Sequence, residues 1–197
     1  KLDAEYNFTP IWKPKFIEAL VSEDRCHLNG MALENGKPKF ATAFNEGNSF
    51  QSWRDKVTET GIVIDIDTNE ILAKNLAMPH SPRIYKGELY VLLSAKGELI
   101  KINRDNGECT TVIKTKGFVR GMDLYEDYLF IGLSKLRKNS STFAKLDFAE
   151  EANVAGIEIY HLPTAALVGR IKYTSSVDEI FDIKIFPDMI RPNILNT

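Results

Sequence analysis

The 197-residue sequence has few cysteines, no long apolar run and no basic excess. Its two cysteines, Cys26 and Cys109, are far apart and form no CxxC pair, which argues against a disulfide framework and favours a reducing compartment, so we expect a cytoplasmic protein. No apolar run approaches the roughly 20 residues of a membrane helix, so we expect no membrane partner. A net charge of -2 and a pI near 6.0 give no basic footprint for nucleic acid.

Common catalytic signatures are also missing. The sequence contains no GxGxxG, Walker, HExxH, EF-hand or GxSxG pattern, so no reaction can be assigned from a motif. Asp65 and Asp67 alternate with isoleucines, which is typical of the polar face of a strand and not of a calcium loop. The chain does not begin with Met, and we expect it to be a piece of a longer or processed protein.

What the sequence does contain is a repeated order of four short strands divided by turns. Asn35-Gly36 is a strong hairpin signal, and Gly87, Gly97 and Gly107 punctuate the most regular set. The sets begin near residues 26, 79, 117 and 178, and a polar insertion at 139–153 interrupts the third. The fourth, 178–188 followed by 191–197, looks incomplete.

This pattern predicts an all-β protein, a β-propeller of four-stranded blades present as a partial set of about three to four blades. Four polar anchors at the starts of the sets, His27, His80, Arg120 and Glu179, are about 53, 40 and 59 residues apart, near the period of a propeller blade with insertions. A non-repeating β-sandwich is the alternative. Residues 1–24 are expected to be a lead-in linker with an anchoring Trp12, the end of an upstream blade, and residues 25–197 to form the blades.

The polar anchors supply the candidate site residues. First strands of propeller blades line the central channel, so their starts should converge. His80 and His27 are the candidate catalytic residues, because an imidazole can move protons near neutral pH or bind a metal. The candidate ligand-binding residues are Asn29, Ser81, Arg83, Arg120 and Glu179.

Two arginines favour an anion, and two histidines with Glu179 leave room for a divalent metal, although no metal or cofactor is identified. The structural alternative is a rigid blade-entry loop with Arg83 in an ion pair, and acidic residues 178–182 neutralising both arginines. Ser81 and His80 are not a nucleophilic dyad, because adjacent strand side chains point to opposite faces. Ser134, Lys135 and Arg137 are predicted to lie on a solvated rim.

Two functional hypotheses follow. In the first, a cytoplasmic propeller binds a small anionic ligand in its channel; an enzymatic version, with lyase or hydrolase chemistry, would use a histidine as general base and the arginines to hold negative charge. In the second, the protein is a non-catalytic scaffold that docks another protein through its rim and the 139–153 insertion.

The segments SEDRCHLNGMA, LAMPHSPRIYKGELYVL, GFVRGMDLY, YLFIGLSKLR and DEIFDI resemble a family of uncharacterised bacterial proteins. That family is described as conserved hypothetical proteins or as a domain of unknown function with a propeller-like fold. The resemblance covers nearly the whole chain and implies that the family extends upstream by roughly another pair of blades. It supplies no catalytic residues.

Overall fold

Three antiparallel sheets, each of four strands, form the main body of the described part of the protein. The computed structural model describes residues 1–136, 146, 149, 152–190 and 192. In each sheet the order of the strands follows their order in the chain, so each sheet is a simple meander. The first sheet contains β1 (Leu28–Glu34), β2 (Lys37–Ala43), β3 (Gly61–Asp65) and β4 (Glu70–Leu76).

The second sheet contains β5 (Pro79–Tyr85), β6 (Glu88–Leu93), β7 (Glu98–Ile102) and β8 (Cys109–Lys114), with a 3-10 turn, η1 (Ser94–Lys96), between β6 and β7. The third sheet contains β9 (Phe118–Tyr125), β10 (Tyr128–Ser134), β11 (Ala155–His161) and β12 (Ala166–Tyr173), with η2 (Leu162–Thr164) after β11. The three predicted sets of strands therefore match the three sheets.

The hairpins form where the sequence predicts them. Asn35 and Gly36 join β1 to β2 with φ of 51° and 74°, and Lys86 and Gly87 join β5 to β6 with φ of 50° and 82°. Positive φ at both central residues gives a turn whose twist suits a two-residue hairpin, and glycine adopts it without steric cost.

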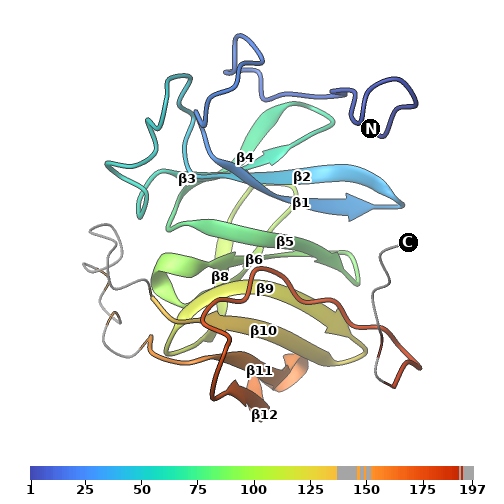
Figure 1. The fold of residues 1–197 in the computed structure, drawn as a ribbon, viewed down its shortest axis with the longest axis vertical. Helices are drawn as coiled ribbons and strands as arrows, with labels where there is room; N and C mark the ends of the chain where they lie inside the picture. Colours follow the sequence, from blue (N-terminus) through green and yellow to red (C-terminus); the bar gives the residue numbers. More distant parts are fainter. Residues whose placement is uncertain (137–145, 147–148, 150–151, 191, 193–197) are drawn as a thin grey trace.

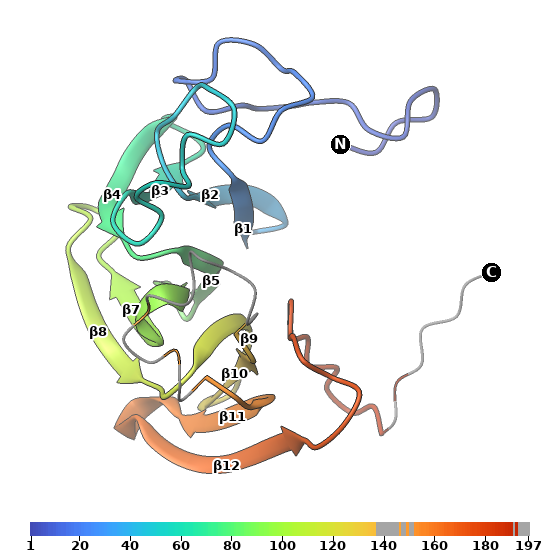
Figure 2. The same cartoon turned by 60° about the vertical axis from the view of Figure 1, so that its left-hand side comes forward.

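The sheets are arranged as the blades of a propeller. Figure 2 shows β1, β5 and β9 on the inner side of an arc and β4, β8 and β12 on its outer side. Inner strand β5 contacts both β1 and β9. The structure is thus an all-β propeller of four-stranded blades with three blades in the described residues, which confirms the predicted fold class.

Apolar layers between successive blades hold the arc together. Phe40, Val63 and Ala32 of the first blade pack against Leu89 and Ile102 of the second. Leu92 and Leu99 of the second blade pack in turn against residues of the third, including Val119, Met122 and Ile131. Most of these side chains are fully buried, so each inter-blade layer is a separate hydrophobic core that fixes the angle between neighbouring blades.

The lead-in, residues 1–24, covers the face of the first blade that is turned away from the second blade. Ile17 is buried against Cys26 and Ile62, and Trp12 and Phe16 are partly buried against the same cluster. Trp12 therefore packs onto the blade. The structure has no helix in this segment or elsewhere in its described residues that is long and apolar enough to cross a membrane.

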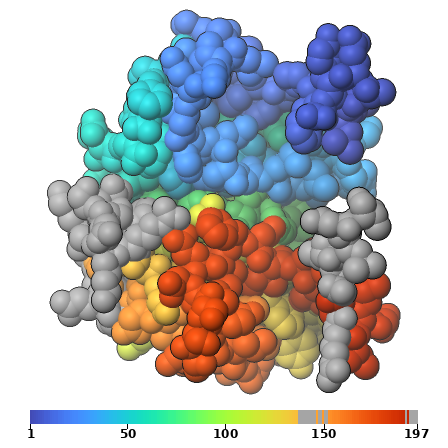
Figure 3. Space-filling view, in the orientation of Figure 1, coloured from blue at the N-terminus to red at the C-terminus, as the bar shows by residue number. Residues whose placement is uncertain are grey.

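The C-terminal segment 178–186 lies along the inner strands without joining a sheet. The sequence pattern predicts strands from residue 178. This prediction is wrong for residues 178–188, which form no strand. The segment is instead held by isolated hydrogen bonds from its backbone to side chains of the third blade. Ile180 N–H donates to Ser134 Oγ at 2.8 Å, and Ile185 N–H donates to Asp123 Oδ2 at 2.8 Å. Figures 1 and 3 show it crossing in front of the third blade.

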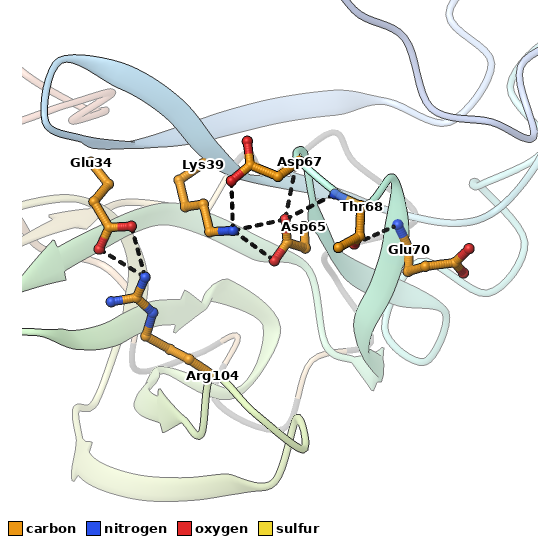
Figure 4. A network of polar contacts seen from close by, with 7 residues as sticks. All are labelled: Glu34, Lys39, Asp65, Asp67, Thr68, Glu70 and Arg104. Carbon is orange, nitrogen blue, oxygen red and sulfur yellow. Dashed lines mark hydrogen bonds and ion pairs between the residues drawn. The ribbon is translucent and has the colours of Figure 1, made fainter.

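A network of ion pairs involves the β1–β2 hairpin, the end of β3 with the turn after it, and the turn between β7 and β8. Lys39 of β2 bonds to Asp65 at 2.9 Å and to Asp67 at 2.8 Å, and Arg104 of the second blade bonds to Glu34 of the first at 2.7 Å (Figure 4). The two aspartates were predicted to lie on the polar face of a strand, but Asp65 is the last residue of β3 and Asp67 lies in the turn that follows, where both hold the lysine. Such pairs add about 0–1 kcal/mol each, so they fix geometry more than stability.

Candidate functional site

The starts of the three inner strands meet around a cavity of ≈ 440 Å³. His27, just before β1, His80 at the start of β5 and Arg120 at the start of β9 all line it, and so does Glu179 of the C-terminal segment. This volume lies in the range of small-molecule sites, about 300–1,000 Å³. The structure therefore brings together one predicted residue from each of the four anchor loops.

The remaining predicted residues line a second, adjacent cavity of ≈ 280 Å³. Asn29, Ser81 and Arg83 are on its wall. His80, Arg120 and Phe181 line both cavities, so the two spaces adjoin at these residues.

His80 is the most buried polar group of the site, with 4% of its surface exposed. Its Nδ1–H donates to Ser94 Oγ at 2.7 Å and lies 3.2 Å from the carbonyl oxygen of Met78. Burial, together with the positive charge of Arg120, lowers the pKa of His80 from 6.5 to about 3. The imidazole is therefore neutral at physiological pH.

His27 is held by an acidic partner that sequence reasoning missed. Its Nδ1–H donates to Asp24 Oδ2 at 2.9 Å, and the same carboxylate oxygen accepts the indole N–H of Trp53 at 3.1 Å. The imidazole stacks on Phe44 with ring centroids 4.5 Å apart. An Asp-held, Nδ1–H imidazole leaves Nε2 as the atom that can accept a proton or a hydrogen bond.

Basic groups slightly outnumber acidic ones around the larger cavity. Arg120 lies over the ring of Phe181 at 4.6 Å, and Arg54 lies over Trp53 at 4.5 Å. Lys135 also lines the cavity and pairs with Asp178 at 2.5 Å. With Asp24 and Glu179 as the acidic lining residues, the wall combines three cations, two carboxylates and several aromatic rings.

Arg83 and Ser81 have structural partners. Arg83 Nη2 donates to both carboxylate oxygens of Asp182, at 2.8 and 3.0 Å, which ties the C-terminal segment to β5. Ser81 Oγ accepts the backbone N–H of Gly121 at 3.0 Å and so links the second and third blades. The ion-pair alternative for Arg83 is the one that the geometry favours.

Asn29 lies in the first blade, where its Oδ1 accepts the hydroxyl proton of Thr42 at 2.7 Å. Its Nδ2 is buried and has no partner in the described part of the chain.

The backbone is irregular where the inner strands begin. The pairing of β1 with β2 shifts register between Leu28 and Gly30, and that of β5 with β6 shifts between His80 and Arg83. Three residues of these entry loops have positive φ of 51° to 56°: His27, Met78 and Ser81. Bulges re-aim side chains, and non-glycine residues with positive φ gather at functional sites.

Gly121 adopts a φ of 78°, and a Cβ on it would lie 2.6 Å from Asp182 Cα. The C-terminal segment thus approaches the backbone closely at this glycine.

The metal expectation gains no support. No three His, Cys, Asp or Glu side chains in the described residues are grouped so as to hold a metal ion. His27, His80 and Glu179 therefore share a cavity without forming a metal-ligand set.

The prediction that Ser134 lies on a solvated rim is wrong. Ser134 is buried, 3% exposed, and hydrogen-bonded to Ile180, so it is no solvated rim residue, and it lines the cavity with Lys135. Arg137, most of the 139–153 insertion and residues 193–197 lie outside the described residues. Leu146 and Ala152 of the insertion are buried in one apolar cluster with Phe44 and Trp53, which line the cavity.

Sequence reasoning also missed several lining or supporting residues. Asp24 is three residues before His27, a spacing that could have suggested a contact. Ser94 gave no signal, because its role depends on folding next to a histidine 14 residues away.

Comparisons with solved structures find low overall similarity. The computationally designed Ika4 protein is 10% identical, with a TM-score of 0.49 over 87% of this chain and 85% of that chain. The computationally designed Ika8 protein is 9% identical (TM-score 0.45, 82% of this chain and 41% of that chain). The hydrazine synthase of Kuenenia stuttgartiensis is 13% identical (TM-score 0.47, 74% and 37%). The chain thus spans less than half the length of the last two.

No curated protein matches the sequence. A family model does, over residues 1–195. The chain belongs to the family described as a domain of unknown function (DUF4915).

Proposed function

We propose that the protein binds a small anionic organic molecule in the cavity at the start of its inner strands. The ligand's negative group would face Arg120, and its apolar part would lie among the aromatic rings. The single observation that carries the proposal is that His27, His80 and Arg120, from three different blades, line one cavity.

The composition of the wall supports an anion with an apolar portion. Arginine suits carboxylate and phosphate groups, because its planar fork donates two parallel hydrogen bonds. Phe44, Trp53, Phe118 and Phe181 supply most of the aromatic wall. A concave apolar surface with a few oriented polar groups is the usual form of a small-molecule site.

A catalytic role for the site remains a further proposal. His27, held by Asp24, is the group that could accept a proton from a bound ligand, whereas His80 is buried and neutral. The two free cysteines, Cys26 and Cys109, agree with the proposed cytoplasmic location. The scaffold alternative is weakened by the shared cavity, since residues spread over separate surfaces would have been expected for it.

Isothermal titration calorimetry with a panel of anions tests the proposal. We expect saturable binding of at least one of benzoate, phenylacetate and phenylphosphonate at pH 7, with affinity reduced about tenfold or more in Arg120→Gln. A lost charge-assisted hydrogen bond costs about 1.5–3 kcal/mol, which corresponds to that factor.

The matched control is His161→Asn. His161 lies at the end of β11, bonded to Thr164, and lines neither cavity. Its substitution should leave affinity unchanged. If no anion of the panel binds, or if Arg120→Gln binds as tightly as the unaltered protein, the proposed function is contradicted.

A further inference from the structure

We propose that the cavity selects carboxylates that carry a hydroxyl group next to the carboxyl carbon, through the Nε2 atom of His80. The inference rests on the proposed function, because it names the class of anion that the same site would take. The chemistry is that of an α-hydroxy acid: a carboxylate for the arginine and a hydroxyl donor for the imidazole.

The hydrogen bonds of His80 determine which of its ring nitrogens carries the proton. Ser94 Oγ lies 2.6 Å from the carbonyl oxygen of Val119, which can only accept a hydrogen bond, so the single hydroxyl proton of Ser94 is used there. The same Oγ must then accept from His80 Nδ1, 2.7 Å away. The carbonyl of Met78, 3.2 Å from Nδ1, also requires a donor. Nδ1 is therefore protonated.

Nε2 is consequently a hydrogen-bond acceptor without a partner among the described residues. Among the described residues, the fully buried side-chain atoms that lack a hydrogen-bond partner belong to Trp12, Asn29 and Asn45. Nε2 of His80 is not one of them, so this atom is not sealed inside the protein and opens to the cavities that His80 lines. Because burial lowers the pKa of His80 to about 3, the ring does not become a donor at neutral pH. Only a ligand that donates a hydrogen bond can satisfy this atom.

The position of Arg120 selects a hydroxyl over an ammonium group. Arg120 lines the same two cavities as His80, and its charge acts on the imidazole. A carboxylate held by Arg120 would place substituents of its neighbouring carbon near Nε2. A second cation beside Arg120 would be repelled, whereas a neutral hydroxyl can donate to Nε2 without that cost. Asp24 and Glu179 are the acidic lining residues of the larger cavity, and Arg54 and Lys135 add further positive charge.

Matched acid pairs that differ by one hydroxyl test the inference by calorimetry: mandelate with phenylacetate, 3-phenyllactate with 3-phenylpropionate, and lactate with propionate. We expect at least one hydroxy acid to bind about tenfold or more tightly than its partner, because a cavity wall with an acceptor that has no other partner rejects the analogue that cannot donate to it. In His80→Asn, which can keep a donor towards Ser94 but has no Nε2, the preference for the hydroxy acid over its deoxy partner should fall below threefold.

Ser94→Ala is the second variant, in case His80→Asn does not fold, as checked by circular dichroism. It removes the closer of the two acceptors that hold the proton on Nδ1, the Ser94 Oγ at 2.7 Å, and leaves only the Met78 carbonyl at 3.2 Å, so we expect it to weaken hydroxy-acid binding selectively. His161→Asn should change neither acid of a pair.

The outcomes separate the two proposals. If the acids bind but every pair stays within threefold, or if the preference persists in both variants, the selection by His80 is refuted and anion binding stands. If neither these acids nor the three anions of the first panel bind, both proposals fail.

Discussion

Lowering the pH from 7 to 5 is expected to destabilise the fold through His80. Burial and the charge of Arg120 lower the pKa of this imidazole from 6.5 to about 3, so between these values the unfolded chain binds a proton that the folded protein does not. The contribution of His80 to the free energy of unfolding is therefore fully present above pH 6.5 and is lost progressively as the pH falls from 6.5 towards 3. For these two pKa values, linkage predicts a loss of about 2 kcal/mol between pH 7 and pH 5 from this group alone.

Urea unfolding at the two pH values measures this loss. Other carboxylates and histidines also titrate, so the informative quantity is the difference between the unaltered protein and His80→Asn, which has no imidazole at this position. The variant should be less stable at pH 7, because it disturbs a buried site, but its stability should depend less on pH by about 2 kcal/mol.

His161→Asn is the control for the substitution itself, because His161 is bonded to Thr164 at the surface end of β11 and its replacement should change the stability at pH 7 by less than about 0.5 kcal/mol. Equal pH dependence in His80→Asn and in the unaltered protein would refute the reasoning, since it would mean that His80 is protonated in the folded state at pH 5.

Two further predictions concern the C-terminal segment. Gly121→Ala should lower the free energy of unfolding in urea by about 1–3 kcal/mol more than Gly36→Ala does. Both glycines have positive φ, of 78° and 74°, so the backbone strain is matched. The new Cβ at position 121 would lie 2.6 Å from Asp182 Cα, whereas nothing lies within 4 Å of a Cβ at position 36. Equal losses would show that the segment does not pack there. Asp123→Asn should lower the free energy of unfolding by about 1–3 kcal/mol, because this buried carboxylate accepts the N–H of Ile185 at 2.8 Å. Limited proteolysis should also cut segment 178–190 faster in this variant, and an unchanged cleavage rate would contradict this anchoring.

The blades could be predicted because their signals are local. Asn35-Gly36 and Gly87 mark hairpins within a few residues, and alternating isoleucines such as Ile62 and Ile64 mark a strand that is buried on assembly. The convergence of His27 and His80 followed from the fold class, since first strands of neighbouring blades start at the same end of a propeller.

The partners of the site residues could not be predicted in the same way. Arg83 pairs with Asp182, 99 positions away, because the C-terminal segment crosses the inner strands without strand pairing, and no periodic pattern encodes that path. Ser94 fixes the proton of His80 from a turn between β6 and β7. The bulges in the inner strands likewise depend on how each blade packs against the next.

The central claim is that His27 and His80 belong to one anion-binding cavity and that His161 does not. The chain has three histidines, so the ring nitrogens can be followed one by one in a long-range ¹H–¹⁵N spectrum of the ¹⁵N-labelled protein. On titration with mandelate or benzoate at pH 7, we predict saturable shifts of the His27 and His80 Nε2 signals at the same ligand concentration and none at His161. Shifts at His161 alone, or titration of His27 and His80 at different concentrations, would contradict the account.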